Sequence, residues 1–192
     1  MNSHVISTKN NSGSKKARFL ANRALLCAIV FLVYIPSGKA QPTACKTVRD
    51  IHDFVQIWND AVIGPGGRSH ACTLQLLTHD ARITGVVMGK DGSSTRVVES
   101  PTEFVAWYEQ RPNQTFWERT LHSSVEVYEN VARVTRTYEV RASATSPVTS
   151  TGIEDFELIF DGHEWRAFSM LWQDATPGKP LPSRYLPKTP HP

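Results

Sequence analysis

Few residues of this chain have the chemistry and setting for proton transfer. His122 lies in a long segment of alternating polarity, and an imidazole in a pocket can act as a general acid or base. Asp155 and Glu157, in a later alternating segment, are the carboxylates that could act with it. A histidine in such a segment can equally be an ordinary residue of a sheet. His122 and Asp155 are therefore the catalytic candidates, and both interpretations stay open.

The sequence lacks the motifs of the common catalytic and cofactor-binding classes. It contains no GxSxG, no HExxH, no phosphate-binding loop and no dinucleotide-binding glycine pattern. His52, His79 and His163 are spread over a predicted helix, a helix–strand turn and a hairpin tip, which is unlike a set of metal ligands. The sequence therefore predicts neither a cofactor nor a metal site.

Arg136 is the most informative polar residue. It shares its alternation with Val134 and Tyr138, so a regular strand directs its side chain toward the apolar face of a sheet. A buried guanidinium needs an anion to offset its desolvation. That anion is either a ligand carboxylate or a protein side chain, and we favour the protein side chain. The candidate partners are Glu118, Asp155 and Glu157.

The alternating segments hold more aromatic surface than the packing of four strands requires. These rings could wall a pocket for a flat apolar ligand, or they could be core between a sheet and its helices. We predict a ligand pocket of six residues, with the core interpretation as the alternative. The predicted lining is Trp117, Arg136, Tyr138, Phe156, Phe168 and Trp172.

The first forty residues differ in composition from the rest of the chain. They follow the pattern of a secretory signal peptide: a basic segment, an apolar run over residues 24–35, and small residues at Gly38 and Ala40. A helix of that run rises about 18 Å, short of the roughly 30 Å hydrocarbon layer of a membrane. We predict that residues 1–40 are a cleaved signal peptide; an uncleaved anchor is the alternative.

Removal of this leader changes the charge of the protein. Residues 1–40 hold six of the 21 basic residues and none of the 18 acidic ones, so the remainder has a net charge of −3. This balance argues against a nucleic-acid partner. The mature protein is therefore expected to be exported, periplasmic or secreted, and without a membrane segment.

Two cysteines remain after the leader, Cys45 and Cys72. A pair of cysteines in an exported chain can form one disulfide, although two separate buried thiols would also fit. Their spacing is neither that of a structural zinc site nor that of a thioredoxin-type motif. We expect a Cys45–Cys72 disulfide.

Hydrophobic periodicity predicts helices followed by strands. An amphipathic helix covers 48–62, a short one 71–77, and a third begins at the capping box Ser100–Glu103. The predicted strands are 81–88, 95–98, 116–128, 131–142, 152–160 and 164–173. Residues 176–192 are rich in proline and basic residues, which is typical of a disordered tail or of one laid along the domain surface. The fold class is α+β.

Three segments carry a resemblance to a known superfamily. They are LLTHDARITG (76–85), SSVEVYENVARVTRTYEVR (123–141) and TGIEDFELIFDGHEWRAFSMLWQD (151–174). The chain resembles the nuclear transport factor 2-like superfamily, also called SnoaL-like or ketosteroid isomerase-like, over residues 46–175. The resemblance implies a cone-shaped, curved antiparallel sheet wrapping three N-terminal helices, so residues 41–175 would form one domain.

The resemblance also bears on activity. The ketosteroid isomerase-like branch needs a carboxylate base where this chain has Gly85. The Arg-x-Asp of limonene epoxide hydrolase-like members is missing from the comparable strand, which reads Arg133-Val134-Thr135. Dehydratase-like members use histidines and an aspartate, for which His122 and Asp155 are the candidates. We therefore expect binding of a small hydrophobic molecule without established catalysis, with a lyase, isomerase or hydrolase as the alternative.

The resemblance further implies a homodimer. In such families the outer face of the sheet commonly pairs two subunits, and a polar contact of this kind is possible. The face would present Arg133, Thr135, Thr137, Glu139 and Arg141. A third hypothesis is a protein-interaction module, in which this face and the tail dock another exported protein.

Overall fold

The computed structural model describes residues 44–65, 69–89, 91–176, 178–179 and 181–187. The predicted signal peptide, residues 1–40, lies outside the described residues. Within the described part of the chain, every helix is too short or too polar to cross a bilayer.

Apart from one helix between the third and fourth strands, and a 3₁₀ turn in the tail, the described helices precede the long strands. A short 3₁₀ turn, Ile51–Asp53, runs directly into α1 (Phe54–Val62), and α2 covers Ala71–Gln75. α3 (Pro101–Glu109) begins at the predicted capping box, where the Ser100 hydroxyl accepts from the Glu103 N–H and the Glu103 carboxylate accepts from the Ser100 N–H. The second helix ends earlier than predicted, because Leu77 already belongs to a strand.

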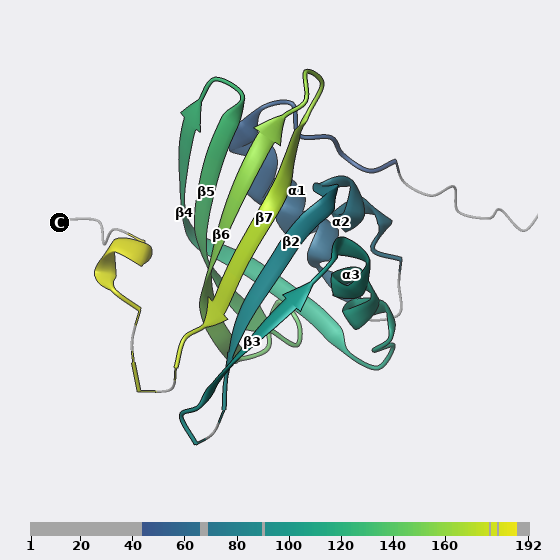
Figure 1. The fold of residues 1–192 in the computed structure, drawn as a ribbon. Helices are drawn as coiled ribbons and strands as arrows, with labels where there is room; N and C mark the ends of the chain where they lie inside the picture. Colours follow the sequence, from purple (N-terminus) through teal and green to yellow (C-terminus); the bar gives the residue numbers. More distant parts are fainter. Residues whose placement is uncertain (1–43, 66–68, 90, 177, 180, 188–192) are drawn as a thin grey trace, which may run out of the picture. The chain divides into compact units, whose positions relative to one another are not determined.

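Seven strands form one sheet in the order β1-β4-β5-β6-β7-β2-β3 (Figure 1). All neighbours are antiparallel except β2 and β7, which run parallel. The α+β class is therefore as predicted. The strands are β1 Gly64–Pro65, β2 Leu77–Met88, β3 Ser94–Glu99, β4 Thr115–Tyr128, β5 Val131–Arg141, β6 Val148–Phe160 and β7 Trp165–Asp174.

The hydrophobic core lies between the helices and one face of the sheet, here called the inner face. α1 contacts β4, and α3 contacts β2. The Phe156 ring of β6 packs edge-on against Phe54 and Trp58 of α1, with ring centres 5.0 and 4.8 Å apart. Such aromatic pairs add about 0.5–1.5 kcal/mol to the burial of their surface. These contacts hold α1 across the strands that carry the buried polar residues described below.

Two bulges decide which strand residues face inward. The pairing of β4 with β5 shifts between Thr120 and His122, so Leu121 is an extra residue. The pairing of β7 with β6 shifts in the same way at Phe168. Because side chains alternate along a strand, one extra residue moves every later side chain to the opposite face. The periodicity of the sequence alone does not show these reversals.

Cys45 and Cys72 are joined by a disulfide, with S–S 2.05 Å and Cα–Cα 5.1 Å. The bond links the segment before α1 to the middle of α2.

Part of the proline-rich tail lies on the outer face of the sheet. Ser183–Tyr185 forms a 3₁₀ turn, and the Thr137 hydroxyl of β5 donates to the Tyr185 carbonyl. Thr137 is fully buried there. Of the two forms expected for the tail, this contact favours the one laid along the domain surface.

Candidate functional site

A cavity of about 830 Å³ opens between the inner face of the sheet and α3. Its wall is mainly apolar, as in most small-molecule sites. Five aromatic rings come from α3, β4 and β7, and aliphatic side chains come from the strands around them. The rings are Phe104, Trp107, Tyr108, Phe116 and Trp172, and the aliphatic residues are Val87, Val97, Val140 and Met170.

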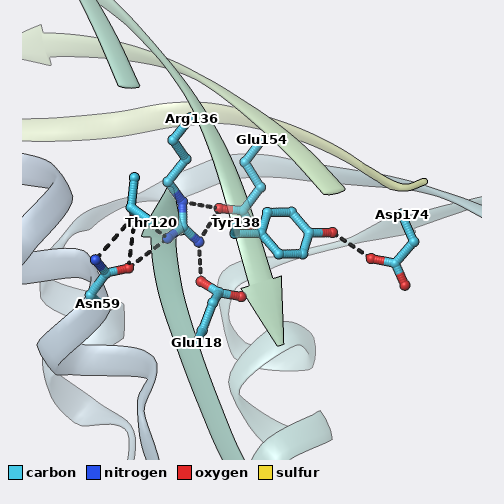
Figure 2. A network of polar contacts seen from close by, with 7 residues as sticks. All are labelled: Asn59, Glu118, Thr120, Arg136, Tyr138, Glu154 and Asp174. Atoms are coloured by element: carbon cyan, nitrogen blue, oxygen red, sulfur yellow. Dashed lines mark hydrogen bonds and ion pairs between the residues drawn. The ribbon is translucent and has the colours of Figure 1, made fainter. Parts of the chain in front are cut away.

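Polar side chains gather at one part of this cavity (Figure 2). Glu118 of β4, Glu154 of β6 and Asp174 of β7 all line it, together with the Tyr138 ring of β5. The Tyr138 hydroxyl donates to Asp174 Oδ1 at 2.6 Å. Glu118 and Glu154 are only 4% and 6% exposed, so two carboxylates are held in a largely apolar setting.

Arg136 lies behind these carboxylates and is fully buried. Its Nε donates to Glu154 Oε2 at 2.6 Å, and one Nη forms an ion pair with Glu118. Its other Nη donates to Asn59 Oδ1 at 2.6 Å and to Thr120 Oγ1 at 3.1 Å. The predicted inward direction of Arg136 is correct, and its partners are protein carboxylates. The guanidinium is therefore already paired and is not offered to a ligand carboxylate.

Burial perturbs the protonation of Glu154 and Tyr138 in this network. Burial raises the pKa of Glu154 to about 7; Arg136 acts against that shift, and the neighbouring Glu118 carboxylate adds to it. Glu154 therefore changes its protonation state near neutral pH. The pKa of the Tyr138 phenol is raised well above its ordinary value, first by burial and then by Glu154 and Asp174.

The raised pKa of Glu154 predicts a stability that depends on pH. The folded protein binds this proton more tightly than the unfolded chain, so the stabilisation is complete below about pH 4.5 and is lost as the pH rises through about 7. Urea unfolding of the wild type and of Glu154→Gln should therefore diverge, with the wild type losing roughly 1–3 kcal/mol relative to the variant between about pH 5 and 8. Parallel curves would contradict the assignment.

Two glycines make room for cavity residues. A Cβ atom on Gly85 would lie 2.4 Å from the Trp172 indole ring. A Cβ on Gly152 would lie 2.3 Å from the Tyr138 hydroxyl and 2.6 Å from the Gln173 carbonyl. Gly85 is the position where the resemblance called for a catalytic base. Here the Trp172 indole fills that space, which gives the glycine a structural reason.

The structure brings together only part of the predicted pocket. Tyr138 and Trp172 line the cavity. Arg136 lies behind the wall, and Phe156 is fully buried in the core against α1. The core interpretation is therefore correct for Phe156, because its ring packs against α1.

Trp117 and Phe168, by contrast, do not line the cavity. Phe168 is 40% exposed, because it is the extra residue of the β7 bulge. Trp117 lies between Phe116 and Glu118, both of which face inward, so it faces outward, where the Arg141 guanidinium lies 5.9 Å from its ring centre.

His122 and Asp155 lie on the outer face, in a smaller pocket of about 270 Å³. The bulge at Leu121 turns His122 outward, and Asp155 alternates with the inward Glu154 and Phe156. Asp155 accepts from Arg133 Nε at 2.9 Å. The two catalytic candidates thus share a surface pocket with Arg184 and Tyr185 of the tail, away from the apolar cavity.

Glu154 and Asp174 were missed by the sequence reasoning, and Glu118 was expected only as a partner of Arg136. Glu154 has the alternation of Phe156 and Leu158, which marks it as an inward acid. That signal was available in the sequence. Asp174 has the alternation of Trp172, a predicted pocket residue, so the same signal was available for it.

The residues that the structure describes contain no cluster of three or more histidine, cysteine or acidic side chains arranged for a metal ion. Glu118, Glu154 and Asp174 belong instead to the network around Arg136 and Tyr138.

No protein-family model and no curated protein matches the chain. Solved structures are similar to it. A nuclear transport factor 2-like protein of unknown function from Silicibacter pomeroyi is 15% identical, with a TM-score of 0.45 over 65% of this chain and 92% of that chain. One from Methylobacillus flagellatus is 14% identical, with a TM-score of 0.46 over 69% and 98%. A proposed ketosteroid isomerase from Parabacteroides distasonis is 14% identical, with a TM-score of 0.47 over 67% and 91%.

The chain is similar in fold to these nuclear transport factor 2-like structures. Its helices, strand pair, third helix and four long antiparallel strands follow the order that the resemblance in sequence implied. At these identities the likeness concerns the fold alone, since such folds carry many unrelated functions. The cavity of the chain itself is therefore the basis for its proposed function.

Proposed function

We propose that this protein binds a small, mainly hydrophobic molecule in the cavity between α3 and the sheet. The observation that carries the proposal is the cavity itself, with its volume of about 830 Å³ and its six aromatic rings. Concave, mainly apolar sites with a few polar groups are typical of small-molecule binding. The carboxylates at one part of the wall would orient the ligand.

A pair of neighbouring valines tests this proposal. Val97 lines the cavity, whereas Val98, the next residue of β3, points to the other face and is 39% exposed. Val97→Trp should fill the cavity and lower the affinity for the neutral dye Nile red at least about tenfold, while Val98→Trp should leave the affinity unchanged. Fluorescence titration measures both. Equal affinities in the two variants would contradict binding in this cavity.

The leader and the disulfide together support export. After loss of residues 1–40 the only cysteines are Cys45 and Cys72, and these are paired. Disulfides persist in secreted and periplasmic proteins and are rare in reducing compartments.

Native mass spectrometry of the exported fraction would report leader removal and any retained compound. Conversion of that compound by the protein would favour the alternative, a lyase, isomerase or hydrolase.

A homodimer through the outer face is the third part of the proposal. The tail residues Arg184 and Tyr185 lie over the part of this face that holds Thr137. A second subunit would have to displace them or pair beside them. We expect deletion of residues 176–192 to raise the dimer fraction at equal concentration, measured by native mass spectrometry or light scattering. An unchanged or lower dimer fraction would show that the tail does not compete for this face.

A further inference from the structure

Acidic side chains outnumber basic ones in the lining of the cavity. Four carboxylates line it, those of Glu99, Glu118, Glu154 and Asp174, and Arg141 is the only lysine or arginine among its described lining residues. The Arg141 side chain is turned to other partners, since its Nε donates to Glu139 at 2.8 Å and its Nη1 to the Ser146 carbonyl at 2.8 Å. Arg136, behind the wall, supplies one positive charge for two adjacent carboxylates.

The carboxylates keep acceptor capacity on the cavity side. Glu118 pairs with Arg136 through Oε1, and Glu154 pairs with it through Oε2. Among the hydrogen bonds and ion pairs between described residues, the second oxygen of each carboxylate has no donor. Figure 2 shows the second oxygen of Glu118 pointing away from the guanidinium. Both residues are more than nine-tenths buried, so a ligand is well placed to supply the missing donor.

The rest of the wall suits a positive charge as well. Trp107, Tyr108, Phe116 and Trp172 line the same cavity as the carboxylates. The face of an aromatic ring attracts a cation, and rings grouped around a site are a common way of recognising organic ammonium ions. A ligand carboxylate would meet like charges in a poorly hydrated site, which costs binding energy.

We propose that the ligand is an organic cation, an apolar molecule that carries a protonated amine. This inference rests on the proposed binding function and names its ligand class. The amine lies against Glu118 and Glu154 and donates to their free oxygens, while the apolar part fills the space between the rings of α3 and the Trp172 indole. Arg136 keeps both carboxylates in place on the side away from the ligand.

Three matched probes test the inference in the wild-type protein. Phenylbutylamine, phenylbutanol and phenylbutyrate share one apolar part and differ in their end group. In a Nile red displacement titration near pH 7, the amine should bind at least about tenfold more tightly than the alcohol, and the carboxylate most weakly. If the alcohol or the carboxylate binds as tightly as the amine, the proposal of a cationic ligand is wrong, while the proposed binding function is still supported. If neither the dye nor any probe binds, the proposed binding function itself fails.

Two substitutions locate the effect. Glu154→Gln removes the carboxylate that pairs with Arg136. Glu99→Gln removes a cavity carboxylate that makes no contact with Arg136. The second variant therefore remains informative if the first does not fold. Each should weaken amine binding about three- to tenfold and leave alcohol binding unchanged. Glu157→Gln, on the outer face of β6, is the matched control and should alter neither. If a variant loses affinity for the amine and the alcohol alike, these residues only shape the cavity, and recognition of the amine by their charge is wrong.

Discussion

Replacing Arg136 with methionine should lower the free energy of unfolding by about 3–5 kcal/mol near pH 7, because it leaves buried carboxylates without their counter-charge. The guanidinium is fully buried and holds Glu118 and Glu154 at once. It also donates to Asn59 of α1, so the change loosens the contact between helix and sheet. Urea unfolding followed by far-ultraviolet circular dichroism measures the loss. The cost should shrink at about pH 5, where Glu154, whose pKa is raised by burial, takes up a proton.

Arg133→Met is the matched control for this experiment. Arg133 is two residues away on the same strand, and its partner Asp155 lies on the exposed face. Exposed ion pairs contribute about 0–1 kcal/mol, so this variant should unfold almost as the wild type does. Adding Glu118→Gln and Glu154→Gln to Arg136→Met should recover most of the lost stability, since no buried charge is then left unpaired. Equal losses for the two arginines would mean that burial of Arg136 has no special energetic role.

Breaking the disulfide should produce the second large effect. The bond closes a loop across 27 positions of the sequence, for which the chain-entropy relation gives about 3–4 kcal/mol. The double variant Cys45→Ser, Cys72→Ser should lose stability by this amount, and the helical layer should open first because α2 is anchored there. Unfolding in urea, with and without a reducing agent, measures the difference.

The reduced wild type serves as the control for the serine substitutions. Reduction should bring it to the stability of the double variant, since both then lack the same constraint. The double variant should not respond to the reducing agent at all. A loss below about 1 kcal/mol would contradict the expected contribution of a loop of this length.

Local patterns were sufficient for most of the framework. The capping box set the start of α3, and the change of period from helical to alternating marked the long strands. The alternation of Arg136 with Val134 and Tyr138 placed its guanidinium on the buried side, and charge compensation then required a partner such as Glu118. These features depend on residues close in sequence, or on the requirement that a buried charge has a counter-charge.

The identity of the site was decided by tertiary structure. A bulge is an interaction between two strands, so the bulges at Leu121 and Phe168, which turn His122 outward and leave Phe168 exposed, depend on pairing partners far away in sequence. The meeting of Glu118, Glu154 and Asp174 likewise depends on the register of β4, β6 and β7. The sequence by itself determined the elements and the buried arginine. Only the tertiary structure decided that Glu118, Glu154 and Asp174 meet at one cavity, because that meeting follows from register and bulges that the helices and neighbouring strands select together.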